Sequence, residues 1–191
     1  MRFEDVRLPR YNAWQMEIQS LTVVTTDVEE TRRVGACLAP LLEPGDVVAI
    51  SGDLGTGKTA FVQGLARGLG VSTPVTSPTF TLINQYRYPT GLLQHVDCYR
   101  LGDAVLEMWD AGLQDMVGDG DIVVIEWAER LELLLPLERI AVRFLYLDER
   151  RRQLEFVGFG ARLVLVIRNL AQACVSRHEA GRQESEVAAT C

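Results

Sequence analysis

The sequence carries no excess of positive charge. Its 191 residues include 19 Lys and Arg against 26 Asp and Glu, so the formal net charge is −7. Domains that bind a nucleic-acid backbone with a broad surface are usually basic. The acidic balance therefore argues against such a domain, and any connection to RNA would need a local basic patch or a partner protein.

Cysteine is scarce, and long apolar runs are absent. The sequence has no C-x-x-C pair, which excludes the usual zinc and thiol-redox motifs and favours free thiols in a reducing cytoplasm. No apolar run is long enough to span a bilayer, and neither end resembles a signal peptide. We therefore expect a cytoplasmic protein with no membrane partner. The four cysteines are Cys37, Cys98, Cys174 and Cys191.

What remains is the composition of a folded globular protein. Hydrophobic residues make up 48% of the chain and charged residues 24%, which is enough to bury a substantial core. A length of 191 residues is typical of one domain with additions at its ends. The patterns below indicate a domain over residues 18–160, an N-terminal extension over 1–17, and a C-terminal helix with a disordered tail over 161–191.

The most informative stretch runs from Gly52 to Thr59 and matches G-x-x-x-x-G-K-[ST], the phosphate-binding loop called Walker A. Glycines allow such a loop to curl so that its peptide N–H groups face phosphate oxygens. Lys58 supplies a positive charge near the terminal phosphates, and the Thr59 hydroxyl can bind Mg²⁺. The helix expected to start here adds the positive end of its dipole.

The sequence on both sides of this loop supports that interpretation. Residues 47–50 form an apolar, β-branched run typical of a buried strand, and apolar residues recur at helical spacing over 61–69, before Gly70. Residues 55–60 also fit the dinucleotide fingerprint. That fingerprint expects an acidic residue about 20 positions later, and none stands at 75–80. We therefore favour the Walker A interpretation.

Two further predicted strands end in carboxylates. Residues 92–96 are followed by Asp97, and residues 122–125 are followed by Glu126. Ligands of open α/β sheets bind at the carboxyl ends of the strands, so both acids should lie near Thr59. A carboxylate at that edge completes the Mg²⁺ site of a phosphate loop. Glu126 also fits the Walker B pattern of four apolar residues followed by an acid.

Two other polar features lie close to these acids in the sequence. His95 shares a strand face with Asp97 and could tune it, and the alternative is a histidine that is simply packed. The loop over 71–80 is rich in hydroxyls that could reach a nucleotide, and the alternative is an ordinary connecting loop. The hydroxyls in question belong to Thr76, Ser77 and Thr79.

The remaining patterns predict the fold class. Residues 26–29 fit a capping box that starts a helix reaching about Leu42, residues 122–125 indicate a central parallel strand, and residues 148–152 indicate a charged hairpin tip. We expect an α/β, three-layer P-loop NTPase-like fold with a mostly parallel central sheet and antiparallel edge strands. Further strands are predicted at 18–25, 79–88, 140–147 and 154–159, and further helices at 104–117, 131–135 and 163–174.

Four segments in this order resemble the TsaE family. They are residues 51–59 (SGDLGTGKT), 76–82 (TSPTFTL), 95–101 (HVDCYRL) and 124–127 (VIEW). The resemblance covers roughly residues 18–160, and only the first segment is widespread among nucleotide-binding proteins. It implies a small bacterial P-loop ATPase required for the threonylcarbamoyladenosine modification of tRNA.

The resemblance also implies partners and a role. In that family, TsaD transfers the threonylcarbamoyl group to adenosine 37 of tRNAs that read codons beginning with A, and TsaE associates with the TsaB–TsaD pair. The TsaE-like subunit does not make that bond. Its turnover of ATP, with Mg²⁺, resets the complex between cycles, so it meets tRNA only indirectly through the complex.

Site residues follow from the resemblance position by position. The phosphates are assigned to Asp53, Leu54, Gly55, Thr56, Gly57, Lys58 and Thr59. The metal is assigned to Thr59 and Glu126 with Asp97 close by, and catalysis to Lys58, Asp97 and Glu126. The adenine contact is expected near Thr26 to Val28 and from Arg151 and Arg152, although Arg150 to Arg152 replace the Gly-Arg turn of the family. The segment 77–79 is expected to behave as a switch.

Two alternatives stay open at this point. A small-molecule kinase shares the phosphate loop and uses arginine lids, which here could come from Arg139, Arg143 and the 150–152 segment. A non-catalytic nucleotide-binding scaffold is the other alternative. A GTPase is disfavoured because no Asn-Lys-x-Asp motif occurs, and an ABC-type ATPase because no Leu-Ser-Gly-Gly signature occurs.

Overall fold

The computed structural model describes residues 19–102, 112, 116 and 120–188, with side chains between residues 20 and 174. The expected extension over 1–17 and most of the helix predicted at 104–117 lie outside these residues.

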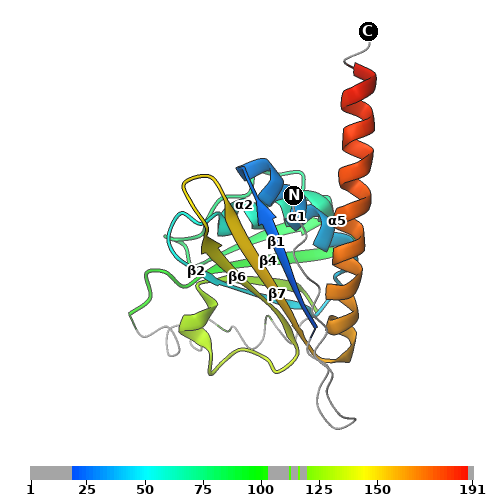
Figure 1. Cartoon of the computed structure of the whole chain (residues 1–191). Coiled ribbons are helices and arrows are strands. Elements are labelled where there is room, and N and C mark those ends of the chain that lie inside the picture. Colours follow the sequence, from blue (N-terminus) through cyan, green and yellow to red (C-terminus); the bar gives the residue numbers. More distant parts are fainter. Residues whose placement is uncertain (1–18, 103–111, 113–115, 117–119, 189–191) are drawn as a thin grey trace, which may run out of the picture.

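A seven-stranded sheet forms the centre of the structure (Figure 1). Its order is β1-β7-β6-β2-β5-β4-β3. The central strand β2 runs parallel to β5 and β6, and β5 runs parallel to β4, whereas β1, β7 and β3 pair antiparallel. The expected fold class is therefore confirmed. The strands are β1 (Gln19–Thr25), β2 (Val47–Gly52), β3 (Ile83–Tyr88), β4 (Gly91–Asp97), β5 (Ile122–Glu126), β6 (Arg139–Tyr146) and β7 (Arg152–Phe159).

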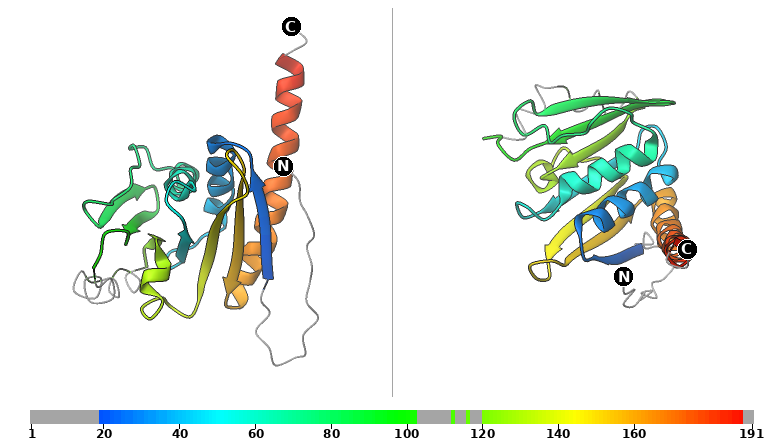
Figure 2. Two further views of the ribbon diagram at one scale, coloured as in Figure 1. Left: turned by 60° about the vertical axis from the view of Figure 1, so that its left-hand side comes forward. Right: turned by 90° about the horizontal axis from the view of Figure 1, so that it is seen from above.

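Helices cover one face of this sheet. Figure 2 shows α1, α2 and α5 beside one another, and their apolar residues share one core with β1, β2, β6 and β7. The opposite face, at β2, β4 and β5, packs against η2 and its neighbours. The helices are α1 (Val28–Leu38), α2 (Lys58–Leu69) and α5 (Ala161–Ala188), and the short 3-10 helices are η1 (Ala39–Leu41) and η2 (Ala128–Leu131).

Strand β5 is buried along its whole length. Its β-branched residues Ile122, Val123, Val124 and Ile125 face the two cores alternately, as expected for a strand covered on both sides. Glu126 is the exception, because it is a charged residue that is only 3% exposed. A buried carboxylate needs partners, and those of Glu126 are described below.

Helices α1 and α2 approach closely through two glycines. A Cβ atom on Gly35 would lie 2.2 Å from the carbonyl oxygen of Phe61, and one on Gly64 would lie 1.9 Å from that of Arg32. Both distances are far below van der Waals contact. The two glycines therefore fix how closely α1, which follows β1, packs against the helix of the phosphate loop.

The start of α1 differs from the predicted capping box by one residue. The N-cap is Asp27, whose Oδ1 accepts a hydrogen bond from the backbone N–H of Glu30 at 2.7 Å. The Glu30 carboxylate accepts in turn from the backbone N–H of Thr26 at 2.6 Å. Thr26 and Glu29 were the wrong pair, because Asp27 is itself a strong N-cap residue and takes the position nearer the helix.

Two other predicted boundaries were wrong for local reasons. The strand predicted from residue 79 begins only at Ile83, because the N–H groups of Thr81 and Leu82 turn back to the carbonyl of Pro78. The helix predicted at 131–135 is replaced by η2, which starts directly after Trp127. Trp127 has φ 61°, so the chain turns sharply at the end of β5.

Helix α5 is longer than the sequence indicated. A helix was predicted over 163–174 with a disordered tail from 176, but helical backbone continues to Ala188. Residues 176–188 contain Ala, Glu, Arg and Gln and no proline, and these are good helix formers. Near its start, Arg162 pairs with the buried Asp46 and with Glu43, which ties α5 to the turn before β2. Within the described ranges, no helix is apolar enough over a sufficient length to cross a membrane.

Candidate nucleotide-binding site

The phosphate loop joins the end of β2 to the start of α2, as the sequence predicted. Gly52 has φ 128°, and a Cβ atom there would lie 2.4 Å from the carbonyl oxygen of Phe144 on β6. Gly57, the N-cap of α2, has φ 103°. Side chains at either position would strain the backbone, so the curled loop depends on these glycines.

Lys58 lies folded back against the loop that contains it. Its Nζ donates hydrogen bonds to the carbonyl oxygens of Gly52 at 2.6 Å and Asp53 at 2.8 Å. It also lies 3.9 Å from the ring centroid of Trp127. Burial lowers the pKa of this ammonium, and the negative charge of Glu126 opposes that shift. An ammonium has three donors, so one N–H is left to meet an anion.

Glu126 links the phosphate loop to the neighbouring strands. Its Oε2 accepts a hydrogen bond from the Thr59 hydroxyl at 3.1 Å, and its Oε1 lies 2.9 Å from Nε2 of His95. A hydroxyl and a carboxylate at this spacing are the oxygen ligands that Mg²⁺ takes beside a triphosphate. The residues present therefore fit the metal that the sequence implied.

Asp97 lies opposite Glu126 in the parallel register of β4 and β5. Its Oδ2 accepts from the hydroxyls of Ser77 at 2.7 Å and Thr79 at 2.6 Å, and its Oδ1 accepts from the backbone N–H of Tyr99 at 2.9 Å. Asp97 therefore holds the hydroxyl-rich loop against the end of β4. His95, for which tuning of Asp97 and simple packing were both left open, contacts Glu126.

The residues after β4 and β5 form one wall beside Lys58. The rings of Tyr99 and Trp127 are 4.9 Å apart between centroids. Arg130 on η2 donates to the carbonyl oxygens of Cys98, Tyr99 and Leu101, the first at 3.0 Å. Sequence reasoning missed Arg130, because nothing in the local pattern shows that a guanidinium will meet three carbonyls of a different loop.

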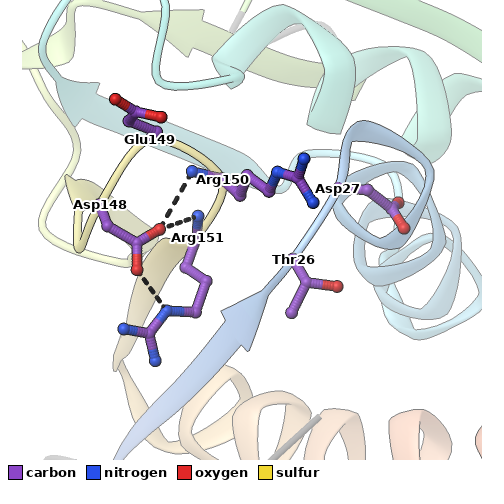
Figure 3. Close-up of a pocket in the computed structure, with 6 residues that line it drawn as sticks. All are labelled: Thr26, Asp27, Asp148, Glu149, Arg150 and Arg151. Atoms are coloured by element: carbon purple, nitrogen blue, oxygen red, sulfur yellow. Dashed lines mark hydrogen bonds and ion pairs between the residues drawn. The ribbon is translucent and has the colours of Figure 1, made fainter.

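A cleft opens between the start of α1 and the tip of the β6–β7 hairpin (Figure 3). Its volume is about 1040 Å³. In Figure 3 the Arg150 side chain extends from the tip toward Asp27, while Arg151 bends back to Asp148, with Nε 2.6 Å from Oδ2. The lining residues are Thr26, Asp27, Asp148, Glu149, Arg150 and Arg151.

Of the residues expected at adenine, Thr26, Asp27 and Arg151 line this cleft. The Val28 side chain is exposed at 53%, and the Arg152 guanidinium lies 4.3 Å from the ring centroid of Tyr146.

Tyr146, at the end of β6, contacts the phosphate loop. Its hydroxyl donates to the carbonyl oxygen of Leu54 at 2.8 Å. The sequence analysis missed this residue. Its signal was available, because Tyr146 stands at the carboxyl end of a strand that pairs with β2, the edge at which ligands bind.

Among the described residues, no group of three or more His, Cys, Asp or Glu side chains could hold a metal ion.

A sequence model of the family described as "Threonylcarbamoyl adenosine biosynthesis protein TsaE" matches residues 25–154. This chain belongs to the TsaE family. The match spans the start of α1, the phosphate loop, both carboxylates and the hairpin tip. The TsaE resemblance that the four sequence segments indicated is therefore confirmed.

Individual TsaE proteins are similar over most of the chain. A relative from Bacillus subtilis is 36% identical over 81% of this chain and 93% of its own length, and one from Nostoc is 41% identical over 76% and 91%. Both are named tRNA threonylcarbamoyladenosine biosynthesis protein TsaE. The crystal structure of YdiB from Bacillus subtilis matches with a TM-score of 0.70 and 31% identity, over 85% of this chain and 97% of that one.

Proposed function

We propose that this chain is a cytoplasmic, Mg²⁺-dependent ATPase that acts in the formation of threonylcarbamoyladenosine at position 37 of tRNAs reading codons that begin with A. The observation that carries the proposal is the contact of Thr59 with Glu126 beside Lys58. This contact joins the phosphate loop to a strand-end carboxylate. A nucleotide with bound Mg²⁺ requires both of these parts. The names of the TsaE relatives supply the pathway.

The phosphates would lie in the loop from Asp53 to Thr59. The free N–H of Lys58 and the peptide N–H groups of the loop and the α2 N-terminus supply donors for them. Burial lowers the pKa of Lys58. A bound triphosphate would raise this pKa again, because nearby negative charge favours the ammonium.

Thr59 and Glu126 would hold Mg²⁺, which neutralises the charge that develops on the phosphates. Asp97 lies beside Glu126 at the same sheet edge. Once Ser77 and Thr79 release its Oδ2, that oxygen is available to the metal sphere or to the attacking water. The rings of Trp127 and Tyr99 shield the ammonium side of the site from solvent.

The adenine base would enter the cleft between Thr26 and the hairpin tip. A cleft of about 1040 Å³ is large enough for a nucleoside. Tyr146 at the end of β6 bonds to Leu54 in the phosphate loop, and the hairpin tip that follows Tyr146 lines the cleft. Base and phosphates would therefore be bound by neighbouring segments.

The partners would be the TsaB and TsaD proteins, and tRNA would be met only through that complex. The net charge of −7 is consistent with this indirect role, because a domain that grips tRNA by itself would be expected to be basic. Hydrolysis would then reset the complex between cycles of transfer, which TsaD performs.

Phosphate release by the purified chain, measured with and without TsaB and TsaD, tests this proposal beside Lys58→Ala. We expect turnover that rises when both partners are present and that is lost in the variant. Absence of turnover in all mixtures would contradict the ATPase assignment and favour a nucleotide-binding scaffold. Transfer of phosphate to a metabolite would favour a kinase. The arginines offered for a kinase lid lie on strands β6 and β7 or in their tight turn, which does not resemble a mobile helical lid.

A further inference from the structure

His95 is a buried histidine with one polar contact. Its side chain is 0% exposed, on the strand beside β5. Its Nε2 lies 2.9 Å from Oε1 of Glu126, whereas Nδ1 is buried with no hydrogen-bond partner among the described residues. The contact with Glu126 therefore accounts for Nε2, and Nδ1 has no partner among the described residues.

The contact with Glu126 fixes which nitrogen carries the proton. A carboxylate can only accept, so Nε2 must donate. A proton on Nδ1 as well would be a buried donor without an acceptor, which costs more than an unpaired lone pair. The geometry therefore favours a ring that donates from Nε2 to Glu126.

The two oxygens of Glu126 are held from opposite elements. Oε1 accepts from His95 on β4, and Oε2 accepts from Thr59 on α2. The last torsion of a glutamate side chain has a broad energy minimum, so a donor on Oε1 determines the direction in which Oε2 points. Without it, Oε1 would be a buried acceptor free to turn toward Thr59.

Neighbouring groups hold the His95 ring in turn. The ring of Tyr86 on β3 packs against it, with centroids 6.4 Å apart. The hydroxyl of Tyr86 donates to the carbonyl oxygen of Thr76, and it accepts from the backbone N–H of the same residue, each at 3.1 Å. The His95 ring, which donates to Glu126, is therefore held between its own strand and Tyr86 on the neighbouring strand.

We propose that His95 is the positioning residue of the Glu126 carboxylate, and that its Nε2–H keeps one oxygen of Glu126 directed at the Mg²⁺ site. The inference rests on the proposed nucleotide function, since His95 would support a residue that binds the metal only if that function is correct. Removal of such supporting donors typically costs about 10- to 100-fold in metal affinity or activity.

The test measures metal binding directly. Mn²⁺ affinity is determined by electron paramagnetic resonance in the presence of a non-hydrolysable ATP analogue, and affinity for the analogue alone is determined in chelator. His95→Phe keeps the ring and removes the donor, while His95→Gln restores an N–H. Gln94→Leu is the matched control, because it removes a buried hydrogen bond, to Asp121, from the opposite face of the same strand.

We expect His95→Phe to weaken Mn²⁺ binding about 10- to 100-fold with unchanged affinity for the metal-free analogue. His95→Gln should recover most of the loss, and Gln94→Leu should bind Mn²⁺ as the unsubstituted chain does. In a Glu126→Gln background, His95→Phe should have little further effect, because the two residues act together.

Unchanged Mn²⁺ affinity in His95→Phe would overturn the proposal, and so would a loss in His95→Gln as large as that in His95→Phe. His95→Leu provides a second donor-free variant if His95→Phe does not fold. An unsubstituted chain that binds no metal-nucleotide complex would overturn the proposed function itself. The two failures are therefore distinguishable.

Discussion

The hydroxyl of Thr59 lies 3.1 Å from the carboxylate of Glu126, although the two residues are 67 positions apart in the sequence. Parallel pairing of β2 with β5 produces this contact, because it aligns Ile50 with Glu126 at the edge where α2 begins. The proposed nucleotide site depends on this alignment of two strand ends.

Glu126→Gln should abolish hydrolysis while sparing nucleotide binding. The amide keeps the size of the side chain but supplies weaker metal ligation and no negative charge, so we expect turnover to fall by at least about 100-fold. Fluorescent adenine nucleotide should still bind in chelator, because the loop and Lys58 are unchanged. Turnover comparable with that of the unsubstituted chain would show that Glu126 is not a metal ligand.

Ser77→Ala with Thr79→Val should release the hydroxyl-rich loop from Asp97. Each hydroxyl donates to the same oxygen, so either single change leaves one donor in place. We expect the double variant to lose about 1.5–3 kcal/mol of unfolding free energy, typical of hydrogen bonds to a charged group. The two single losses should sum to less than this, measured by urea denaturation. Equal and additive single losses would contradict a shared acceptor.

Arg151→Ala should raise the pKa of Asp148. Hydrogen bonds from the backbone and then the side chain of Arg151 hold this pKa at about 2, below its ordinary 3.8. Because the pKa is depressed, the stabilising contribution of the carboxylate is present above pH 3.8 and is lost as the pH falls toward about 2.

The backbone donors of Arg150 and Arg151 survive that substitution. The pKa of Asp148, followed by NMR of its carboxyl carbon, should therefore rise but stay below 3.8. Arg151→Lys serves as the control, because it keeps the positive charge but removes the Nε–H donor. A pKa that remains at about 2 in Arg151→Ala would mean that the side chain contributes nothing.

Gly64→Ala should destabilise the fold even though alanine is the better helix former. The gain in helix propensity is at most about 1 kcal/mol. The new Cβ atom would lie 1.9 Å from the Arg32 carbonyl oxygen, and such overpacking costs about 1–3 kcal/mol or more. We expect a net loss of unfolding free energy, measured by thermal or urea denaturation. Arg33→Ala, on the exposed side of α1, should be nearly neutral, and a stabilised Gly64→Ala would refute the close approach.

Much of the fold could be predicted because its signals are local. The spacing from Gly52 to Lys58 specifies a phosphate loop without reference to the rest of the chain, and the β-branched residues before Glu126 specify a buried strand. The order of the strands in the sheet could not be predicted from local sequence patterns. Pairing of β2 with β5 and β6 is set by burial of two cores together, which no single segment encodes.

The site was predictable in its main parts but not in its connections. Asp97 and Glu126 were found as strand-end acids, because both follow apolar runs. Their partners were not found. A role of His95 at Asp97 was one of two alternatives, because the two residues share a strand face, but the neighbouring strand brings Glu126 against His95. The predicted N-cap was one residue too early, because the adjacent polar residues Thr25, Thr26 and Asp27 can all cap a helix and Asp27 takes that position.

Among the described strands, β1 pairs only with β7, which is made much later because it lies far along the sequence. One wall of the cleft follows β1, and the other is the tip of the hairpin that ends in β7. Under the proposed function, discrimination between adenine and other bases should therefore be acquired only after residues 152–159 have been made and have paired with β1.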